Sequence, residues 1–362
     1  MISSHDERRE TTLSSEQPGR GHGISRTSRV ARCPCARRFT RRQRHQLPLL
    51  VKQLKTRVGV VPFVGAGMSV PFGFPAWRPF LESQAPDDAA RQEIRKQLDD
   101  GEYEAAAESL LKAKGADAFH TALADTFGAH RLANPLPAAA IMQLPRLCSG
   151  PVLTTNFDPV MERVFDNARR KFEKIILGMK VKELREAFDH SRRVLVKLHG
   201  DAADQSSRVL TLGDYARAYG KREPLKAFLR FAATRPLLFL GCSLEQDRTV
   251  RVFEALAGEL RNQKAEDLLV HYAMVERPAA DAKFIKRNQR LTDLGIRPIW
   301  CPHGQHGIIA DLMAHLAAVA GRDPVCGQVP KEPLHYLLRD EELSALRASL
   351  LATDVANVAI TG

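Results

Sequence analysis

The stretch that decides the fold is Val58-Gly59-Val60-Val61-Pro62-Phe63-Val64-Gly65-Ala66-Gly67-Met68-Ser69. A short apolar run is followed at once by Gly-Ala-Gly, which predicts a buried strand that ends in a tight turn. Pro62 is unusual in such a strand, because proline removes one donor from the hydrogen-bond ladder. A glycine turn of this kind lets the backbone approach a phosphate group, and the N-terminus of a following helix adds N–H donors. The same pattern also describes an ordinary strand-to-helix turn.

Apolar runs of this kind recur along the chain and alternate with helical patterns. We predict further strands at 151–155, 194–198, 236–241, 269–275 and 296–300, and helices at 158–171, 222–234, 245–262, 280–293 and 307–320. Such alternation is typical of a parallel sheet that is covered by helices on both faces. Residues 78–147 instead show alanine-rich helical stretches, at 87–111 and 116–127, and no clear strand. We therefore predict an α/β, Rossmann-like fold with a helical insertion at about 78–147.

The charge is concentrated at the N-terminal end of the chain. Residues 1–50 hold eleven arginines and four acidic residues, so they carry +7 of the formal net charge of +12. Residues 1–46 contain too few apolar side chains to offset the entropy of ordering, and we expect a basic disordered tail. Such a tail is either a dispensable extension or an arm that binds nucleic acid or another anionic surface. We favour the first reading and do not expect nucleic acid as a partner.

The cysteines and the hydropathy indicate a cytoplasmic protein. The six cysteines are scattered and form no Cys-x-x-Cys pair, which indicates reduced thiols rather than a disulfide framework. No apolar run approaches the roughly 20 residues that a membrane-spanning helix needs, so we expect no membrane partner. Cys301, His303 and His306 lie in a loop with Pro and Gly, and their spacing is not that of a zinc site. We therefore expect no metal.

Three further polar clusters follow predicted strands. They are Thr154-Thr155-Asn156-Phe157-Asp158, His199-Gly200-Asp201 and Gly241-Cys242-Ser243-Leu244-Glu245-Gln246-Asp247. Ligands of open α/β sheets bind outside the carboxyl ends of the strands, so these side chains are candidates for a site. Each cluster also has a plain structural explanation, with Asp158 and Ser243 as helix caps and Asn156 and His199 as turn residues.

Taken in order, these four motifs resemble the sirtuin-like family of silent information regulator 2 proteins. The prokaryotic branch of that family is also similar in Gly73-Phe74-Pro75-Ala76-Trp77, and in Val209-Leu210-Thr211 with the following Tyr215. The resemblance spans about residues 58–320. It implies that one NAD site is built from all four motifs, with NAD⁺ as the substrate.

The resemblance also implies a role for each matching residue. Asn156 would orient the nicotinamide ribose or the attacking water, and His199 would act as general base on a ribose hydroxyl or on water. The implied cofactor-binding residues are Gly65, Ala66, Gly67, Ser69, Thr155, Asp158, Gly241, Ser243 and Asp247. The implied activity is hydrolysis of the nicotinamide–ribose bond of NAD⁺ to nicotinamide and ADP-ribose.

Two departures from the deacetylating sirtuins bear on that activity. Those proteins carry a structural zinc held by two pairs of cysteines, and this chain has no such pairs. Their Pro-Asp-Phe-Arg stretch reads Pro75-Ala76-Trp77-Arg78 here. We therefore expect an NAD⁺ hydrolase without zinc. The alternatives are a catalytically silent module that binds NAD or ADP-ribose, and an NAD-dependent protein deacylase.

The predicted domains are a tail at 1–46, the sirtuin-like domain at 47–321, and a third region at 322–362. This last region begins with a proline-rich linker, followed by a helical stretch at 339–346 and a strand-like stretch at 355–362. That order resembles the lead-in to the phosphate-binding loop of STAND-type signalling NTPases, although an ordinary terminal helix and strand would look similar. The resemblance implies the effector domain of a prokaryotic antiphage defence protein, either as a fragment of a longer sensor or as a reading frame that ended early. Such a protein would self-associate when an unidentified phage-derived trigger activates it.

Overall fold

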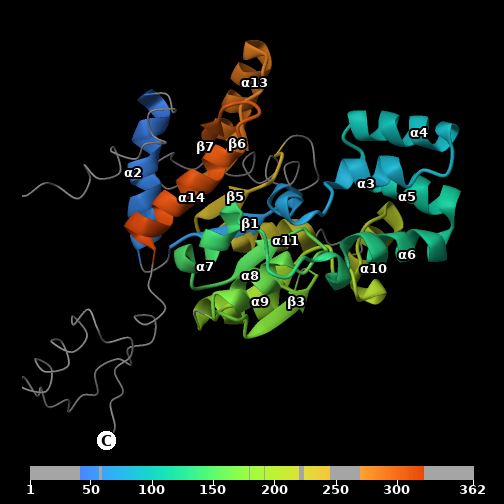
Figure 1. The fold of residues 1–362 in the computed structure, drawn as a ribbon, viewed down its shortest axis with the longest axis horizontal. Coiled ribbons are helices and arrows are strands. Elements are labelled where there is room, and N and C mark those ends of the chain that lie inside the picture. Colours follow the sequence, from blue (N-terminus) through green and yellow to red (C-terminus); the bar gives the residue numbers. More distant parts are fainter. Residues whose placement is uncertain are drawn as a thin grey trace, which may run out of the picture. The chain divides into compact units, whose positions relative to one another are not determined.

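The computed structural model describes residues 41–56, 59–178, 180–190, 192–219, 224–244 and 270–321. Seven strands form one sheet in the order β3-β4-β2-β1-β5-β6-β7 (Figure 1), and every pairing is parallel. The strands are β1 (Val61–Val64), β2 (Val152–Thr154), β3 (Lys174–Leu177), β4 (Val194–Lys197), β5 (Leu237–Leu240), β6 (His271–Glu276) and β7 (Ile296–Cys301). The predicted α/β, Rossmann-like fold is confirmed.

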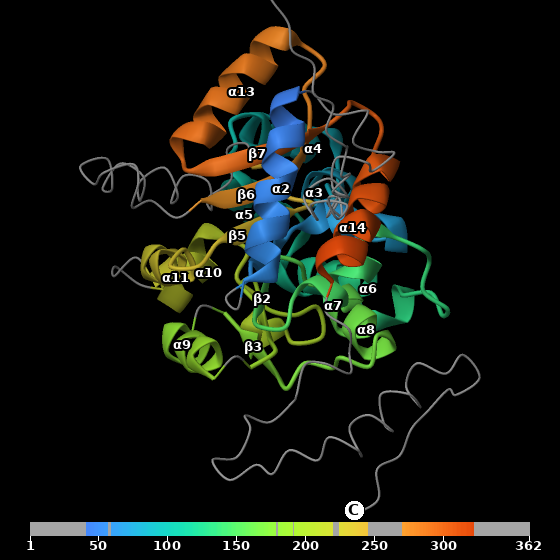
Figure 2. The same cartoon turned by 90° about the vertical axis from the view of Figure 1, so that its left-hand side faces the viewer.

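Two helical layers cover the two faces of this sheet. One layer contains α2 (Arg41–Lys55), α7 (Leu144–Leu147), α8 (Val160–Asn167) and α14 (Gly307–Ala320). The other contains α9 (Val181–Asp189), α10 (Leu212–Tyr219), α11 (Pro224–Ala232) and α13 (Asp281–Asp293). Figure 2 shows α9, α11 and α13 on one side of the sheet and α7, α8 and α14 on the other.

Alternation along the strands divides the apolar core between these layers. In β5, Leu238 and Leu240 belong to the cluster under α2 and α14, whereas Leu237 and Phe239 belong to the cluster under α11 and α13. All four side chains are fully buried. Burial of a large apolar side chain stabilises the fold by about 1.5–3 kcal/mol. Because both faces of a central strand are covered by helices, every position of its sequence favours an apolar residue.

The proline in the central strand lies at the edge of the hydrogen-bond ladder. The N–H groups of Val61 and Gly65 donate to carbonyl oxygens of Pro236 and Leu240 on the β5 side, at 2.8 and 2.9 Å. Backbone groups alternate in direction along a strand, so position 62 faces β2. Pairing between β1 and β2 begins only at Phe63 with Leu153, and the missing donor of Pro62 therefore falls outside the ladder.

Strand β3 was not predicted. It lies at the end of the sheet, pairs only with β4 among the described strands, and reads Lys-Ile-Ile-Leu, with Ile175 exposed and Ile176 buried. Four residues that begin with a lysine give a weak hydrophobic signal. The helix predicted at 158–171 is correspondingly shorter, since α8 ends at Asn167.

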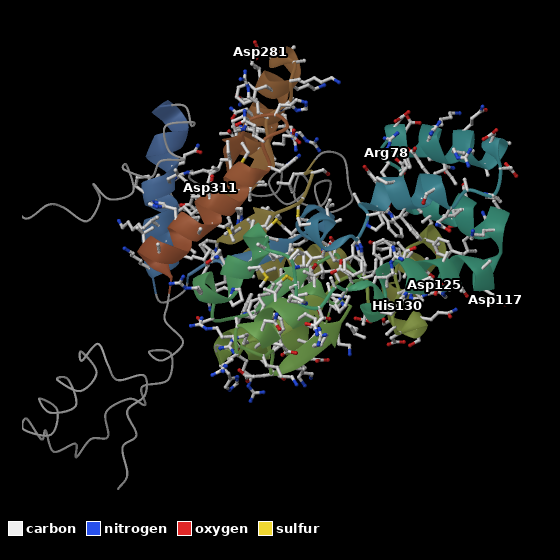
Figure 3. The ribbon with its side chains drawn as sticks, in the orientation of Figure 1. Arg78, Asp117, Asp125, His130, Asp281 and Asp311 are labelled. Carbon is white, nitrogen blue, oxygen red and sulfur yellow. The ribbon has the colours of Figure 1, made fainter. Side chains whose placement is uncertain are left out.

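The insertion between β1 and β2 is helical, as predicted. It contains α3 (Trp77–Ser83), α4 (Asp88–Asp99), α5 (Tyr103–Lys114) and α6 (Ala116–Phe127). The stretch expected as one helix at 87–111 is two helices, because Asp100 and Gly101 between them are poor helix formers. Arg78, Asp117 and Asp125 lie on these helices, and His130 lies in the 3₁₀ turn Ala129–Arg131 that follows α6 (Figure 3).

Residues 41–46, expected to belong to a disordered tail, are helical and form the start of α2. Leu47, Leu50, Val51 and Leu54 place buried apolar side chains on one face of this helix. Once such a face is packed, a helix extends beyond it at little cost because only nucleation is unfavourable. Residues 1–40 and 322–362 and the helix predicted at 245–262 lie outside the described residues. Within the described part of the chain, no helix combines the length and apolar character needed to cross a bilayer.

Candidate functional site

A cavity of about 440 Å³ lies at the carboxyl ends of the central strands. The chain runs from β1 through β2 to β3 at the edge of the sheet, comes back to β4, and then crosses to β5 on the other side of β1. Such a switch point is where open α/β sheets bind ligands. The predicted site residues that line the cavity are Gly65, Ala66, Gly67, Thr155, Asn156, Asp158, His199, Gly241 and Ser243. Ser69 lies outside this lining, and Asp247 lies outside the described residues.

The loops after β1 and β5 touch each other at the cavity. The Gly67 N–H donates to the Gly241 carbonyl oxygen at 3.0 Å. A Cβ atom on Gly65 would lie 2.7 Å from that same oxygen, and one on Gly241 would lie 2.5 Å from the backbone nitrogen of Met68. Gly241 also has a φ of +65°, in the left-handed region. Glycine is therefore required at both positions by the close approach of the two backbones.

The helix expected directly after the glycine loop is not an α-helix. Two 3₁₀ turns follow instead, at Ala66–Met68 and Val70–Phe72, and α3 begins only at Trp77. Pro71, Gly73 and Pro75 explain this, because proline and glycine disfavour α-helical continuation. The N–H groups of Met68 and Ser69 donate to the carbonyl oxygens of Gly65 and Ala66, at 3.1 and 2.9 Å. These donors are used within the loop, so they do not form the predicted phosphate-binding helix N-terminus.

Asn156 is the most constrained polar residue of the cavity. It is 6% exposed, and its Nδ2 donates to Ser69 Oγ at 2.9 Å and to the Gly65 carbonyl oxygen at 3.2 Å. The carbonyl acceptor fixes the orientation of the amide, since only the NH₂ group can face it. The Oδ1 atom is buried and has no hydrogen-bond partner among the described residues. Leaving such an acceptor unpaired costs about 1–3 kcal/mol, which is typical of a group that serves a ligand or water.

Ser69 joins Asn156 to Asp158 beneath the cavity. Its side chain is hydrogen-bonded to the Asp158 carboxyl group, which also accepts the Val160 N–H at 3.1 Å at the start of α8. Burial raises the pKa of Asp158, against the opposing effect of these hydrogen bonds. Asp158 thus serves the helix start and also lines the cavity. Ser69, which the resemblance places beside the pyrophosphate, is hydrogen-bonded to both the Asn156 amide and the Asp158 carboxyl group.

His199 follows β4 and faces the cavity from the other side. Its Nε2 atom lies 2.9 Å from the Tyr215 hydroxyl oxygen, and the Tyr215 ring stands edge-on to the imidazole at 82°. The ring of Phe157 lies 6.1 Å from the imidazole, measured between centroids. Tyr215 appeared in the sequence only as part of a motif, and the structure adds it to the cavity lining.

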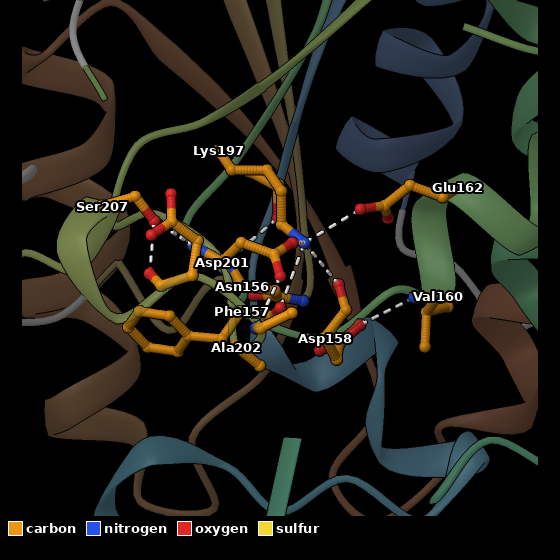
Figure 4. Close-up of polar contacts among 12 residues, drawn as sticks. Asn156, Phe157, Asp158, Val160, Glu162, Lys197, Asp201, Ala202 and Ser207 are labelled. Carbon is orange, nitrogen blue, oxygen red and sulfur yellow. Dashed lines mark hydrogen bonds and ion pairs between the residues drawn. The ribbon is translucent and has the colours of Figure 1, made fainter. Parts of the chain in front are cut away.

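Lys197 is a residue of the site that the sequence reasoning missed. Its side chain is wholly buried, and its Nζ donates to the carbonyl oxygens of Phe157 and Asp158, both at 3.0 Å (Figure 4). Nζ also contacts Glu162 at 2.9 Å and Asp201 at 2.5 Å. Burial alone would lower the pKa of Lys197, but the two carboxylates prevail and raise it. The one feature of the sequence that could have indicated this role is a lysine at the end of an otherwise apolar strand.

This lysine network ties together the two halves of the site. Phe157 and Asp158 belong to the turn that carries Asn156, whereas Asp201 belongs to the turn that carries His199. Lys197 therefore fixes the spacing between the two turns. Asp201, which the sequence places at a strand end among the candidate polar groups, points to Lys197.

The insertion supplies an aromatic wall. Trp77 and Phe127 lie 5.6 and 6.0 Å from Phe157, measured between ring centroids, and all three rings line the cavity. Tyr103 and Glu104 extend this wall. Planar aromatic rings suit a flat ligand ring and keep water away from it.

The loop that follows β7 was considered as a metal site on sequence grounds. His303 Nδ1 lies 2.8 Å and His306 Nε2 lies 3.7 Å from the Glu276 carboxylate. Cys301 is buried in β7, where burial raises the pKa of its thiol to about 12. Across the described ranges, no group of three or more His, Cys, Asp or Glu residues is placed to hold a metal ion.

The structure thus combines a Rossmann-like parallel sheet with a cavity at its switch point, where such sheets bind ligands. A family model for the SIR2-like domain matches residues 151–299. The chain therefore contains a SIR2-like domain over these residues, which implies NAD-related activity. The match includes Asn156, Asp158, His199, Gly241 and Ser243, whereas the Gly65 loop and the helical insertion precede it.

Proposed function

We propose that this protein hydrolyses the nicotinamide–ribose bond of NAD⁺ and releases nicotinamide and ADP-ribose. The observation that carries the proposal is the meeting of Asn156 and His199 in one cavity of a SIR2-like domain. Asn156 presents a buried amide oxygen without a partner among the described residues. His199 supplies an imidazole, the side chain best suited to proton transfer near neutral pH.

The cavity fits a dinucleotide in size and in lining. Its volume of about 440 Å³ falls within the roughly 300–1,000 Å³ range of small-molecule sites. In the loop after β1, Gly65, Ala66 and Gly67 have small side chains or none, so a pyrophosphate could approach their backbone closely. Gly241 and Ser243 lie where the adenosine half would extend, and we keep Asp247 as a proposed contact there. The aromatic wall of Trp77, Phe127 and Phe157 would hold the nicotinamide ring.

The reaction requires charge to develop at ribose C1′ as the neutral nicotinamide leaves. Asn156 Oδ1 accepts a hydrogen bond from the attacking water or from a ribose hydroxyl and so positions it. His199 takes the proton of that group. The Asp158 carboxyl group, in the same polar chain, contacts the carboxamide. The aromatic wall keeps other water from the reacting carbon.

We propose water as the acceptor in place of an acyl-lysine. Deacylating sirtuins hold their peptide beside a small domain stapled by zinc and two cysteine pairs. In the part of the chain that the structure describes, Cys148, Cys242 and Cys301 form no disulfide bond. The helical insertion contributes Trp77, Tyr103 and Phe127 to the lining of the cavity.

The wider setting is proposed from sequence resemblance alone. A STAND-type region at 322–362, self-association, a phage-derived trigger and a cytoplasmic location would together fit an effector that depletes NAD⁺ during infection. None of these is needed for the chemistry at the cavity.

The test is incubation of the purified protein with NAD⁺, followed by chromatography of nicotinamide and ADP-ribose. Matched Asn156→Ala and His199→Ala variants, checked for folding by circular dichroism, serve as controls. Tight NAD⁺ binding without any product would favour a catalytically silent binding module instead.

A further inference from the structure

The contact between Tyr215 and His199 is built into the fold from both sides. The Tyr215 hydroxyl oxygen lies 2.9 Å from His199 Nε2, both residues line the cavity, and Tyr215 is only 6% exposed. The Val209 N–H donates to the His199 carbonyl oxygen at 3.1 Å. This backbone bond holds the segment that leads to Tyr215 against the turn that carries His199.

The start of α10 fixes Tyr215 further. Thr211 Oγ1 accepts the Asp214 N–H at 3.0 Å, while Asp214 Oδ2 accepts the Thr211 N–H at 3.0 Å. This reciprocal pair is a capping box, which sets where the helix begins. The Gly213 N–H also donates to Glu108 of α5 at 3.3 Å. Tyr215 therefore stands in the first turn of a helix whose start is held by its own cap and by the insertion.

We propose that Tyr215 carries the proton between His199 and the reacting hydroxyl, a step that rests on the proposed NAD⁺ cleavage. A neutral phenol donates its O–H readily, and a neutral imidazole accepts at the nitrogen without a proton. Tyr215 donates to Nε2, so His199 carries its own proton on Nδ1. As the phenol proton moves to Nε2, the same oxygen takes the proton of the ribose hydroxyl or attacking water. One proton thus passes from the reacting group to His199, which becomes cationic, and Tyr215 is unchanged.

The position of the phenol is the reason for a relay. The Tyr215 oxygen occupies the direction in which Nε2 would accept a proton, so a ligand hydroxyl reaches that nitrogen only through Tyr215. His199 and Tyr215 then act as one base of two residues. Each residue alone would be ineffective in this role.

The kinetic test uses Tyr215→Phe, which removes one oxygen and keeps the ring. We expect kcat to fall by about 10²–10⁴-fold, the usual contribution of a general base, with KM within a few-fold of the wild type. The double variant with His199→Ala should be no slower than the slower single variant, because the two residues form one unit. Tyr272→Phe is the control, since that buried tyrosine of β6 is bonded to Arg297 away from the cavity.

A spectroscopic test reports on the same bond without turnover. The ¹⁵N signals of His199, assigned by their loss in His199→Ala, should show the Nδ1–H tautomer in the wild-type protein. In Tyr215→Phe, the same ¹⁵N signals should show a larger population of the Nε2–H tautomer. Should Tyr215→Phe fail to fold, the wild-type tautomer still decides the matter.

The outcomes separate the relay from the activity on which it rests. A wild-type protein that releases nicotinamide, with a Tyr215→Phe variant within about threefold of it in kcat, would overturn the relay alone. The Nε2–H tautomer in the wild-type protein would do the same, because Tyr215 would then be the acceptor. Failure of the wild-type protein to release nicotinamide would overturn the proposed function and the relay together.

Discussion

The Nζ atom of Lys197 lies 3.0 Å from the carbonyl oxygen of Asp158, so a buried cation on one strand holds the turn that follows its neighbour. The same ammonium group is neutralised by Glu162 and Asp201. The backbone that presents Asn156 is therefore positioned electrostatically from within the domain. A site whose two candidate catalytic residues come from different strands needs such a connection to keep their spacing.

Lys197→Met should strongly destabilise the protein, because the substitution leaves the carboxylates of Glu162 and Asp201 without their buried cation. Breaking a buried ion pair by removing one partner costs about 3–5 kcal/mol. Urea denaturation should show a loss of this size in the free energy of unfolding. Lys182→Met, at an exposed position of α9, is the control and should change it by less than about 0.5 kcal/mol. A decrease of less than about 1 kcal/mol in the free energy of unfolding of Lys197→Met would show that the buried ion pairs of Lys197 do not hold the two turns together.

His271 should make the fold sensitive to acid. It is 6% exposed, accepts the Leu237 N–H at 3.1 Å, and has its pKa lowered by burial to about 4. The unfolded chain then binds a proton more readily than the folded protein between about pH 6.5 and pH 4. Stability is therefore present above pH 6.5 and is lost as the pH falls toward 4, by about 3 kcal/mol in total.

His271→Asn keeps an acceptor for Leu237 and removes the titration. Thermal melts between pH 7 and pH 4 should show a smaller decrease in Tm for this variant than for the wild-type protein. His130→Asn, at an exposed histidine, should leave the pH dependence unchanged. Identical curves for the wild-type protein and His271→Asn would show that another group causes the acid sensitivity.

The contact between the loops after β1 and β5 should not tolerate a side chain at Gly65. Gly65→Ala places a methyl group 2.7 Å from the Gly241 carbonyl oxygen, and forcing the backbones apart should cost about 1–3 kcal/mol. NAD⁺ affinity, measured by calorimetry, should fall together with Tm. Gly150→Ala meets no atom within 4 Å and is the matched control. Wild-type affinity and Tm in Gly65→Ala would show that the two loops can separate freely.

Acetyl-lysine peptides should neither accelerate NAD⁺ consumption nor lose their acetyl group. The proposed acceptor is water, because the sequence has no cysteine pairs to staple the zinc domain that borders the peptide groove of a deacylase. Mass spectrometry of peptide and nucleotide products checks this, with and without a chelator, which should have no effect. Stoichiometric O-acetyl-ADP-ribose would identify a deacylase instead.

The architecture could be predicted from the sequence where burial is complete. The apolar runs that became β5 and β7 are covered by helices on both faces, so their composition reflects the fold directly. Strand β3 could not be found in the same way, since an edge strand with an exposed Ile175 carries only half of that pattern. The 3₁₀ turns after Gly65 depend on Pro71, Gly73 and Pro75, which disfavour the α-helix that a glycine turn after a strand suggests.

The site was predictable only in part for a similar reason. Residues at strand ends, such as Asn156 and His199, follow from the general position of sites in α/β sheets. Lys197 and Tyr215 act through contacts with segments distant in the chain or on another element. No local pattern reports the 3.0 Å contact of Lys197 with the Phe157 carbonyl oxygen or the approach of Tyr215 to the His199 imidazole. The hydrogen bond from Asn156 to the Ser69 hydroxyl joins residues 87 positions apart, and the motif of Ser69 does not predict it.

The most direct test of the central claim is the rate of nicotinamide release from NAD⁺ by the purified protein and by Asn156→Ala and His199→Ala, with Tm measured on all three. The account predicts turnover by the wild-type protein and a loss of at least about 10²-fold in each variant, with each Tm within a few degrees of the wild type. Either variant turning over NAD⁺ at the wild-type rate would contradict the assignment of the site, and a wild-type protein that leaves NAD⁺ intact would contradict the activity itself.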